Sequence, residues 1–342
     1  MARTAVFLND TSNSYHWGCF ATSSVLKNAV SGWGYDVVSL DVETTHAGFG
    51  VPADVACPEA FAAQLPAANP TLHRALQECA IVVINGEGTI HRTHRGPRSL
   101  LAMVWACASV YGKPIHVLNH SLFPSGTTQP AGADTEAYYR RCLSRLTRAV
   151  VRDRWSVTSY RRLGVIAHEG FDCLPLYPVQ ATTRPRLIVL GAASHWSQAE
   201  AARLGRLLRR SGLDRSRFVF LSGGPKEPPE DAAHYDGLRS EIPGLAILRA
   251  ESVGDWVNAL ASADLLVTGR YHHLVAAASH GTPFAAFAGN TDKNAALCDL
   301  IGATPPIITT SDPEETAFRF HMCAPSLSRE LLRRAAVNLL PA

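Results

Sequence analysis

An arginine and two histidines stand together in the sequence Arg270-Tyr271-His272-His273. They follow Asp264–Thr268, a short apolar run typical of a buried parallel strand, and they precede Leu274–Ser279, a small-residue stretch that predicts a helix. A guanidinium and an imidazole therefore lie where a strand ends and a helix begins, and the free amides and dipole of a helix start favour an anion. The pattern predicts an anion-binding site with a titratable group beside it.

The two adjacent histidines should have different surroundings. Neighbouring helical residues point about 100° apart, so one of His272 and His273 faces the ligand and the other packs or is solvated; the sequence leaves open which. A histidine at a helix start can also be a solvated cap, an alternative that the nearby Arg270 weakens. His280 lies further along the same helix, and we assign it a structural role.

Segments typical of strands and helices alternate along almost the whole chain. Strands are predicted at Ala5–Leu8, Tyr35–Val42, Ile81–Ile84, Pro114–Leu118, Ala149–Arg152, Arg186–Leu190, Phe218–Leu221, Ala246–Leu248, Asp264–Thr268 and Phe284–Phe287. Helices are predicted at Ala21–Val30, Leu72–Cys79, Arg98–Val110, Thr135–Leu146, Ser156–Leu163, Ser197–Arg210, Glu230–Arg239, Val253–Ala261, Leu274–Ser279 and Ser328–Leu340. The alternation predicts an α/β fold with two Rossmann-like, doubly wound domains that face each other across a cleft.

The length of 342 residues also favours two domains. The proline-rich stretch Asp172–Arg184 has the composition of a linker, which places an N-terminal domain at residues 1–175 and a C-terminal domain at 186–325. The amphipathic segment at residues 326–342 is expected to dock through its apolar face, and in such folds a tail of this kind can pack back on the N-terminal domain.

Polar and glycine-rich loops follow most of the predicted strands. In the first half they contain Asn9, Asp10, Trp17, Asn85, Glu87, His91 and Asn119, and in the second half Ser222, Gly223 and Gly224. Glycines allow close backbone approach, and amides and hydroxyls suit sugar or phosphate oxygens. None of these loops has the spacing of a dinucleotide fingerprint or a P-loop, so neither NAD nor ATP is indicated. Tight turns that bind no ligand are the alternative for each loop.

Composition narrows the class of protein. Hydrophobic residues make up 46% and charged residues 18% of the chain, and the net charge of +3 lacks the basic excess of a nucleic-acid binder. No secretory signal or long apolar run stands out, so we expect a cytoplasmic protein, with peripheral association at the inner face of the membrane left open. The eight cysteines show no paired spacing, which argues against a disulfide framework, and no metal site is indicated.

Several short motifs resemble those of the polysaccharide pyruvyl transferases. They are Asn9-Asp-Thr with Asn13, Trp17-Gly-Cys-x-Ala-Thr22, Ile84-Asn-Gly-Glu-Gly-Thr-Ile-His91, Val151-Arg-Asp153 with Ser156 and Gly164, and Gly269-Arg-Tyr-His272 with Gly281-Thr-Pro283 and Lys293. The resemblance touches nearly the whole chain, and its most specific part is the arginine-x-histidine motif followed by Gly-Thr-Pro and lysine. It implies a GT-B-like fold and transfer of a pyruvyl group from phosphoenolpyruvate to sugar hydroxyls of a cell-surface glycan or its lipid-linked precursor, forming a ketal, with no further cofactor.

The resemblance also implies roles for individual residues. His272 corresponds to the proposed acid/base, and Arg270 to the arginine that binds the donor. Phosphoenolpyruvate carries a carboxylate and a phosphate, which suit a guanidinium and an ammonium such as Lys293, and an imidazole can move the protons. We assign Ser222, Gly223, Gly224 and His273 to the donor side. On the acceptor side we place Asn9, Trp17, Asn85, His91 and Asn119, with Asp10 and Glu87 as hydroxyl ligands or base.

Two other classes of function remain open from the sequence. A GT-B-type glycosyltransferase would use a nucleotide-activated sugar, including a CMP-sugar, and would need an apolar slot for the base, for which Phe287 or Trp256 are candidates. A non-catalytic glycan-binding or nucleotide-binding protein is the third reading. The sugar acceptor and the oligomeric state are not indicated by the sequence.

Overall fold

A computed structural model describes residues 3–13, 16–46, 57–179, 186–193, 196–222, 224–225, 229–303, 327 and 329–341. The chain forms two compact units. Unit 1 comprises Met1–Asn13, Thr22–Leu176 and Leu331–Ala342, and unit 2 comprises Ser14–Ala21 and Tyr177–Glu330. The start of the first helix therefore belongs with unit 2, and the C-terminal segment belongs with unit 1.

Unit 1 is built on a six-stranded parallel sheet with the order β2-β1-β3-β4-β5-β6. Its strands are β1 Arg3–Asp10, β2 Tyr35–Asp41, β3 Ile81–Glu87, β4 Ile115–His120, β5 Arg148–Val151 and β6 His168–Glu169. Every residue of β3 is buried, as expected for an apolar central strand covered on both faces. The chain reverses its direction across the sheet between β1 and β3, and such a switch point is where ligands bind in open α/β sheets.

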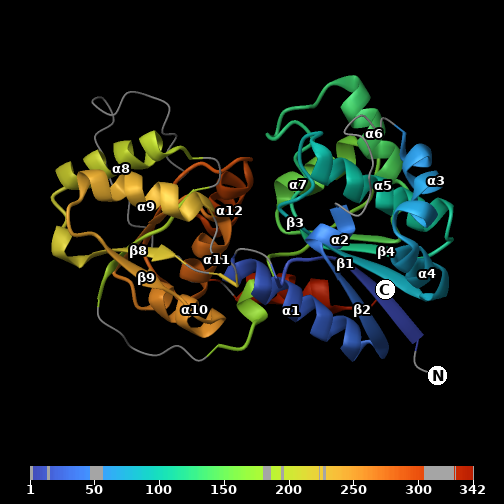
Figure 1. The fold of residues 1–342 in the computed structure, drawn as a ribbon, viewed down its shortest axis with the longest axis horizontal. Coiled ribbons are helices and arrows are strands. Elements are labelled where there is room, and N and C mark those ends of the chain that lie inside the picture. The colour runs from blue at the N-terminus through green and yellow to red at the C-terminus, as the bar shows by residue number, and fades with distance from the viewer. Residues whose placement is uncertain are drawn as a thin grey trace. The chain divides into compact units, whose positions relative to one another are not determined.

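Helices cover both faces of this sheet. They are α1 Trp17–Gly32, α2 Val42–His46, α3 Pro58–Ala68, α4 Pro70–Glu78, α5 Arg95–Ser109, α6 Ala133–Leu143 and α7 Arg154–Arg162, followed by the short 3-10 helix η1 Leu174–Leu176. Figure 1 shows α5 and α6 on one face and α1 on the other. The layers on either side bury the apolar strands and hold the strand ends at one edge of the sheet.

Unit 2 contains a five-stranded parallel sheet with the order β11-β10-β7-β8-β9. Its strands are β7 Ile188–Leu190, β8 Phe218–Ser222, β9 Ala246–Arg249, β10 Leu265–Thr268 and β11 Phe284–Ala286. The helices are α8 Gln198–Arg210, α9 Pro229–Glu241, α10 Val253–Ala261, α11 Tyr271–Ser279 and α12 Lys293–Ile301, with the 3-10 helix η2 Arg215–Arg217. Figure 1 shows α8 and α9 on one face and α10 on the other, so the switch point lies between β7 and β10.

The C-terminal segment contains α13 Arg329–Ala336 and the 3-10 helix η3 Val337–Leu339. Leu331 and Ala335 are buried, and the fully buried Asn338 joins two parts of unit 1. Its side-chain oxygen accepts from the Asn119 amide at 2.9 Å, and its side-chain nitrogen donates to the Phe171 carbonyl at 2.8 Å. Asn338 therefore provides hydrogen-bond partners for a backbone amide and a backbone carbonyl that strand pairing does not satisfy.

The predicted fold class is confirmed, because both sheets are parallel and each is wound by helices on both faces. Several element boundaries differ from the prediction. The helix expected at Ala21–Val30 begins at Trp17, and the one expected at Leu274–Ser279 begins at Tyr271. The sequence pattern also missed α2, α3, α12 and the short β6. The predicted linker at Asp172–Arg184 includes η1, and its residues 180–184 lie outside the described part of the chain.

Candidate functional site

The turn between β10 and α11 holds the predicted arginine and histidines at the switch point of unit 2. Arg270 is the N-cap residue of α11, and its backbone amide donates to Thr268 Oγ1 at 3.1 Å. Thr268 Oγ1 in turn donates to the Ala192 carbonyl of the loop after β7 at 3.0 Å. These bonds fix the two neighbouring loops to each other and orient Arg270.

The same two loops approach each other too closely for ordinary side chains. A Cβ added to Gly191 would lie 2.5 Å from Thr268 Oγ1, and one added to Gly269 would lie 2.4 Å from the Ala193 Cβ. Contacts this short force a shift of the neighbouring atoms. Glycine is therefore required at both positions for the loops to pack as they do.

The Arg270 side chain is held by an acidic residue that the sequence analysis did not identify. Arg270 and Asp231, in the first turn of α9, are each 5% exposed, and the guanidinium donates to Asp231 Oδ1 at 2.6 Å. Ser222 donates to the other carboxylate oxygen at 3.2 Å. Glu230 lies 3.7 Å from the same guanidinium nitrogen. A charge-assisted bond between buried groups fixes the direction of the guanidinium plane.

His16 contacts Arg270 from the segment just before α1. The His16 ring nitrogen Nε2 lies within hydrogen-bonding distance of an Arg270 guanidinium nitrogen. Burial, followed by the positive charge of Arg270, holds the pKa of His16 well below its usual range. The ring is therefore neutral at physiological pH and accepts a hydrogen bond from the arginine.

The two adjacent histidines of α11 are in different environments, which the sequence left open. His273 is 7% exposed and packs edge-on against Trp256, whose ring N–H donates to His273 Nε2 at 3.4 Å. Burial lowers the pKa of His273 to about 3. His272 is less buried, and its Nδ1 lies 3.8 Å from the Cys19 Sγ. His273 thus belongs to the interior of unit 2, and His272 is the more exposed of the two histidines.

Lys293 is the first residue of α12, in the connection that follows β11. Because β10 and β11 are neighbours in a parallel sheet, the starts of α11 and α12 lie at the same sheet edge. Asn294 ties them together, since its side-chain nitrogen donates to the carbonyls of Gly269 and Phe287, each at 2.8 Å. Two helix starts, a guanidinium and an ammonium therefore gather at one edge of unit 2.

The remaining residues predicted for the donor side lie around β8. Ser222 is the last residue of β8, and its hydroxyl donates to the Asp231 carboxylate. Gly224 follows in a bend. Gly223 lies outside the described residues. Trp17, predicted on the acceptor side, belongs to unit 2, where its ring N–H donates to the Ala250 carbonyl at 3.0 Å.

Three predicted residues of unit 1 share an unusual backbone conformation. Asn9, Glu87 and Asn119 have φ values of 57°, 36° and 53°, in the left-handed region that side chains other than glycine rarely adopt. They lie in the last two residues of β1, β3 and β4, which are adjacent in the sheet. Strained backbone of this kind collects at functional sites, and here it lies beside the switch point.

A buried hydrogen-bond network surrounds the Glu87 carboxylate. Glu87 Oε1 accepts from Thr11 Oγ1 and Thr22 Oγ1, each at 2.7 Å, and from the Asn85 side chain at 3.3 Å. Oε2 takes part in none of these bonds. Asn9 adds to the same cluster by donating to the Asn85 carbonyl at 2.6 Å. The network anchors one carboxylate oxygen and leaves the other for a further partner.

Asp10 is fully engaged within unit 1. Its carboxylate forms a 2.7 Å ion pair with Lys27 and accepts hydrogen bonds from the Ser39 hydroxyl and from the Ser12 backbone amide. Burial raises its pKa, but the bonds from Lys27, Ser39 and Ser12 outweigh this effect, and the net pKa is lowered. A carboxylate held as an anion in this way is a poor proton acceptor.

The other residues predicted on the acceptor side have some polar atoms with hydrogen-bond partners and some without. Asn119 Oδ1 accepts from the Cys173 amide at 3.0 Å, and His91 Nδ1 lies 2.7 Å from the Gly88 carbonyl. Within the described part of the chain, Asn119 Nδ2 and Asn85 Oδ1 are buried without a hydrogen-bond partner. Unsatisfied buried amides are costly and call for an explanation, and a ligand is one.

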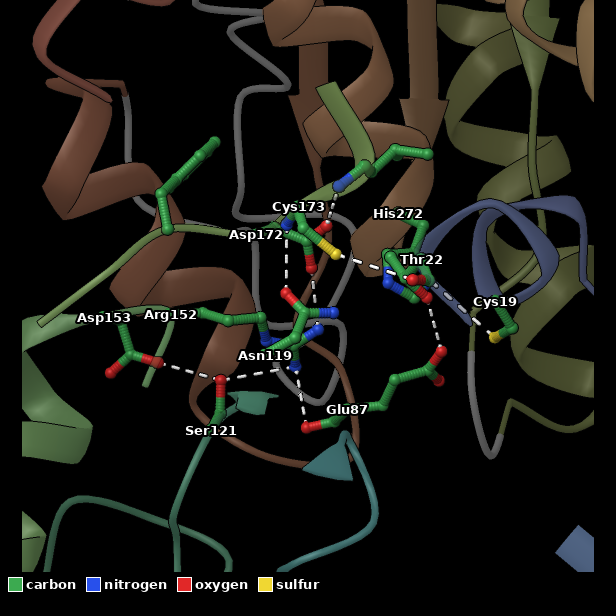
Figure 2. Close-up of polar contacts among 12 residues, drawn as sticks. Cys19, Thr22, Glu87, Asn119, Ser121, Arg152, Asp153, Asp172, Cys173 and His272 are labelled. Carbon is green, nitrogen blue, oxygen red and sulfur yellow. Dashed lines mark hydrogen bonds and ion pairs between the residues drawn. The ribbon is translucent and has the colours of Figure 1, made fainter. Parts of the chain in front are cut away.

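A second buried cluster, next to Glu87, was not identified from the sequence as part of a site. Arg152 and Asp172 form a 2.9 Å ion pair with side chains 1% and 0% exposed, and Arg152 also donates to the Glu87 carbonyl at 3.1 Å (Figure 2). Ser121 donates to Asp153 Oδ2 at 2.8 Å. Asp153, which belongs to one of the motifs described above, is the N-cap of α7, and aspartate at this position is a strong local signal for a helix start.

Because several histidines are buried in the neutral form, we expect the free energy of unfolding to fall at acidic pH. Burial lowers the pKa of His120 in unit 1 and His273 in unit 2 to about 3, against about 6.5 in an unfolded chain. Between these values the unfolded state binds more protons, so the free energy of unfolding falls as the pH falls from about 6.5 towards 3, by at most about 1.4 kcal/mol per pH unit for each histidine.

This pH dependence is measured by urea unfolding at several pH values between 7 and 4. His273→Gln should flatten the dependence, whereas His168→Gln, at an exposed position, should leave it unchanged. Equal slopes for the parent and His273→Gln would show that His273 does not carry the effect.

The structure resembles several solved structures that share little sequence with it. The UDP-GlcNAc 2-epimerase from Methanocaldococcus jannaschii aligns with a TM-score of 0.59 at 10% identity, over 98% of this chain and 99% of that chain. The corresponding enzyme from Neisseria meningitidis, bound to UDP-GlcNAc, gives 0.60 at 10% identity, over 98% of each chain. Anabaena Alr3699/HepE, in complex with UDP and glucose, gives 0.54 at 11% identity, over 98% and 95%. These similarities define a GT-B-like fold.

The family is shown by the sequence itself. The family model for polysaccharide pyruvyl transferase matches residues 11–291, a range that contains Glu87, Arg270 and His272. The chain belongs to the polysaccharide pyruvyl transferase family and is a transferase. A search of curated proteins finds no match. Among the described residues, no helix has the length and hydropathy to cross a membrane, and no three His, Cys, Asp or Glu side chains gather as metal ligands.

Proposed function

We propose that this transferase moves a pyruvyl group from phosphoenolpyruvate to two hydroxyls of a sugar in a cell-surface polysaccharide or its precursor, and so forms a pyruvate ketal. One observation carries the proposal. Arg270 and His272 flank a single residue at the start of α11, at the switch point of unit 2, with the guanidinium fixed by buried Asp231. A held cation beside a histidine suits an anionic donor that must be protonated.

Donor binding is assigned to Arg270 and Lys293. A guanidinium has five N–H donors, and the bonds to Asp231 and His16 use only part of them, so donors remain for a carboxylate or phosphate. Lys293 adds a second positive charge at the start of α12. Gly223 and Gly224 stay assigned to this side, whereas Ser222 and His273 support it by holding Asp231 and Trp256.

The reaction requires a proton at carbon and the loss of two hydroxyl protons. His272 gives a proton to the methylene carbon of phosphoenolpyruvate, whose double-bond electrons form the new C–H bond and leave the adjacent carbon electrophilic. One sugar oxygen bonds to that carbon and returns its proton to the imidazole. The second sugar oxygen then displaces phosphate, which leaves with the carbon–oxygen bonding pair, and the second hydroxyl proton ends on the phosphate. An imidazole is suited to both proton transfers near neutral pH.

Recognition of the sugar is assigned to the strand ends of unit 1. The second oxygen of Glu87 accepts a hydroxyl proton or hydrogen bond, and the amides of Asn85 and Asn119 provide an acceptor and a donor for hydroxyl groups. Asn9 supports Asn85 by donating to its carbonyl, and Asp10, held as an anion by Lys27, stays assigned to the acceptor side as a hydroxyl ligand. His91 stays assigned to the acceptor as well.

A nucleotide-sugar glycosyltransferase is the competing function, and one observation weakens it. The two aromatic residues proposed to form a slot for the base, Trp256 and Phe287, are 1% and 0% exposed. Trp256 packs on His273, and Phe287 packs on Trp196. Both rings are therefore core residues of unit 2 and do not provide a stacking surface for a base.

The two functions are separated by one pair of assays. The protein is incubated with a glycan acceptor and either phosphoenolpyruvate or a set of UDP-sugars and CMP-sugars, and released phosphate and nucleotide are measured. Phosphate release that depends on the acceptor, together with a new acid-labile pyruvate ketal in the product, supports the proposal. Nucleotide release with no phosphate release would replace it with the glycosyltransferase.

Arg270→Lys should weaken donor binding more than it lowers turnover. Lysine keeps the charge but loses the planar pair of N–H donors, and the loss of one charge-assisted bond of about 1.5 kcal/mol or more raises the donor KM roughly tenfold or more. Donor saturation kinetics and calorimetric titration measure the effect.

Arg217→Lys is the matched control, because Arg217 forms an ion pair with Asp264 at the opposite ends of the strands and makes no contact with the cluster. An Arg270→Lys variant that folds and binds phosphoenolpyruvate as tightly as the parent would show that the anion is bound elsewhere.

A further inference from the structure

Residues 16–19, which lead into and form the first turn of α1, make three contacts with the rest of unit 2. His16 contacts Arg270, Trp17 donates to the Ala250 carbonyl, and Cys19 contacts His272. All of these residues belong to unit 2, although the turn lies far from the rest of that unit in sequence. His16 and Cys19 are therefore structural parts of the donor cluster.

Cys19 is a reduced, buried thiol, 7% exposed, with its sulfur 3.8 Å from His272 Nδ1 (Figure 2). Two other buried thiols contact backbone carbonyls instead: Cys79 contacts Leu76, and Cys173 contacts Thr22. A partner that is an ionisable ring gives Cys19 a chemical role that packing alone does not require.

Gly18, next to Cys19, lies in close contact with the side chain of the same histidine, His272. A Cβ on Gly18 would lie 2.4 Å from His272 Cβ, 2.6 Å from Cγ and 2.9 Å from Nδ1. Glycine is thus the residue that allows the ring to lie against the α1 backbone with Nδ1 turned towards the sulfur. This close approach is independent of the thiol contact and points to the same orientation of the ring.

We propose that Cys19 is a positioning residue for His272: its thiol donates to Nδ1 and holds the neutral imidazole in the tautomer that carries its proton on Nε2. The inference rests on the proposed function of His272 as the proton carrier. A thiol is a weak donor, and an unprotonated ring nitrogen is a good acceptor, so this direction of the bond is chemically favoured. The same arrangement, in which a second group selects the tautomer of a catalytic histidine, is effective in other acid/base sites.

The tautomer decides which proton is transferred first. With Nε2 protonated and Nδ1 bonded to the thiol, the ring presents a proton to the methylene carbon of phosphoenolpyruvate. As that proton leaves Nε2, the Cys19 proton moves to Nδ1, so the ring stays neutral and the sulfur becomes a thiolate. The proton from the first sugar hydroxyl then returns to Nε2, and the Nδ1 proton returns to the sulfur. The thiol, the ring and the total charge are restored at the end of the cycle.

The tautomer can be measured without any substrate. Protonated and unprotonated ring nitrogens of histidine have well-separated ¹⁵N shifts, and the His272→Gln variant identifies the His272 signals. At about pH 8 the parent should show His272 with an unprotonated Nδ1, and Cys19→Ala should shift the equilibrium towards a mixture of tautomers. A parent spectrum with Nδ1 protonated, or an unchanged equilibrium in Cys19→Ala, overturns the proposal.

Kinetics provide a second test. Cys19→Ala should lower kcat roughly tenfold, a part of the 10²- to 10⁴-fold that a positioned acid/base contributes, and should leave the donor KM within about twofold. Cys19→Ser keeps a donor and should recover part of the loss. In the His272→Gln background, Cys19→Ala should have no further effect, because a positioning residue acts only through the ring that it positions.

The controls separate a failed inference from a failed function. Cys57→Ala removes a thiol that contacts Glu59 in unit 1 and should leave kcat unchanged. If the parent releases no phosphate from phosphoenolpyruvate, the proposed function fails while the ¹⁵N result still stands. If the parent is active and both Cys19→Ala and Cys19→Ser fold and turn over at the parent rate, the function stands and the role of Cys19 is overturned.

Discussion

Replacing His272 with glutamine is expected to lower turnover by on the order of a hundredfold or more, with donor binding largely intact. Glutamine keeps the size and polarity of the side chain but cannot gain and lose a proton near neutral pH, and this step contributes about 10²- to 10⁴-fold in acid/base catalysis. Phosphate release under saturating donor measures turnover, and calorimetric titration with phosphoenolpyruvate measures binding.

His280→Gln is the matched control, because it makes the same change at the exposed C-terminal end of the same helix. It should turn over at the parent rate. If His272→Gln is as active as the parent, the proton comes from another group, and Glu87 is then the next residue to test. Comparison with Arg270→Lys separates the two roles, since one variant should change kcat and the other the donor KM.

Replacing Asp172 with alanine is expected to destabilise unit 1 by about 3–5 kcal/mol. The change leaves the Arg152 guanidinium, with its side chain 1% exposed, without the carboxylate that balances its charge, and breaking a buried ion pair from one side has a cost of this size. It also removes the acceptor of the Leu174 amide, which donates to Asp172 Oδ1 at 2.9 Å. Urea unfolding measured by circular dichroism gives the change in the free energy of unfolding.

An exposed ion pair provides the comparison. Glu59 pairs with Arg141, with side chains 38% and 52% exposed, so Glu59→Gln should change stability by less than about 1 kcal/mol. The double variant Arg152→Met, Asp172→Leu should be more stable than Asp172→Ala, because it leaves no unpaired buried charge. If Asp172→Ala costs no more than Glu59→Gln, the Arg152–Asp172 pair is not a structural anchor.

The fold was predictable because its strands are short apolar runs and their ends are polar. Short apolar runs such as Ile81–Ile84 and Asp264–Thr268 strongly favour buried parallel strands. Helix starts were harder. The sequence pattern places Trp17 in a loop, but tertiary contacts of Trp17 and Cys19 hold the first turn of α1 in place despite the glycine between them. The proline within α3, Pro66, similarly concealed that helix.

The site was predictable only as far as local sequence determines it. Arg270 and His272 follow directly from the end of a strand. The residues that hold them do not: Asp231 lies 39 positions from Arg270, and Cys19 lies 253 positions from His272. Pairs of this kind form when segments that are far apart in the sequence pack against each other, which no local pattern reports. The orientation of His273 towards Trp256 is likewise a result of packing.

The C-terminal segment of unit 1 has a consequence for how the protein is made on the ribosome. The strands of unit 1 emerge early in synthesis, but Asn338, which satisfies the amide of the strained Asn119 and the carbonyl of Phe171, emerges only after all of Tyr177–Glu330. Until then, the end of β4 has an uncapped backbone amide next to a residue in the left-handed region. Unit 1 is therefore the first to begin folding during translation and the last to be completed.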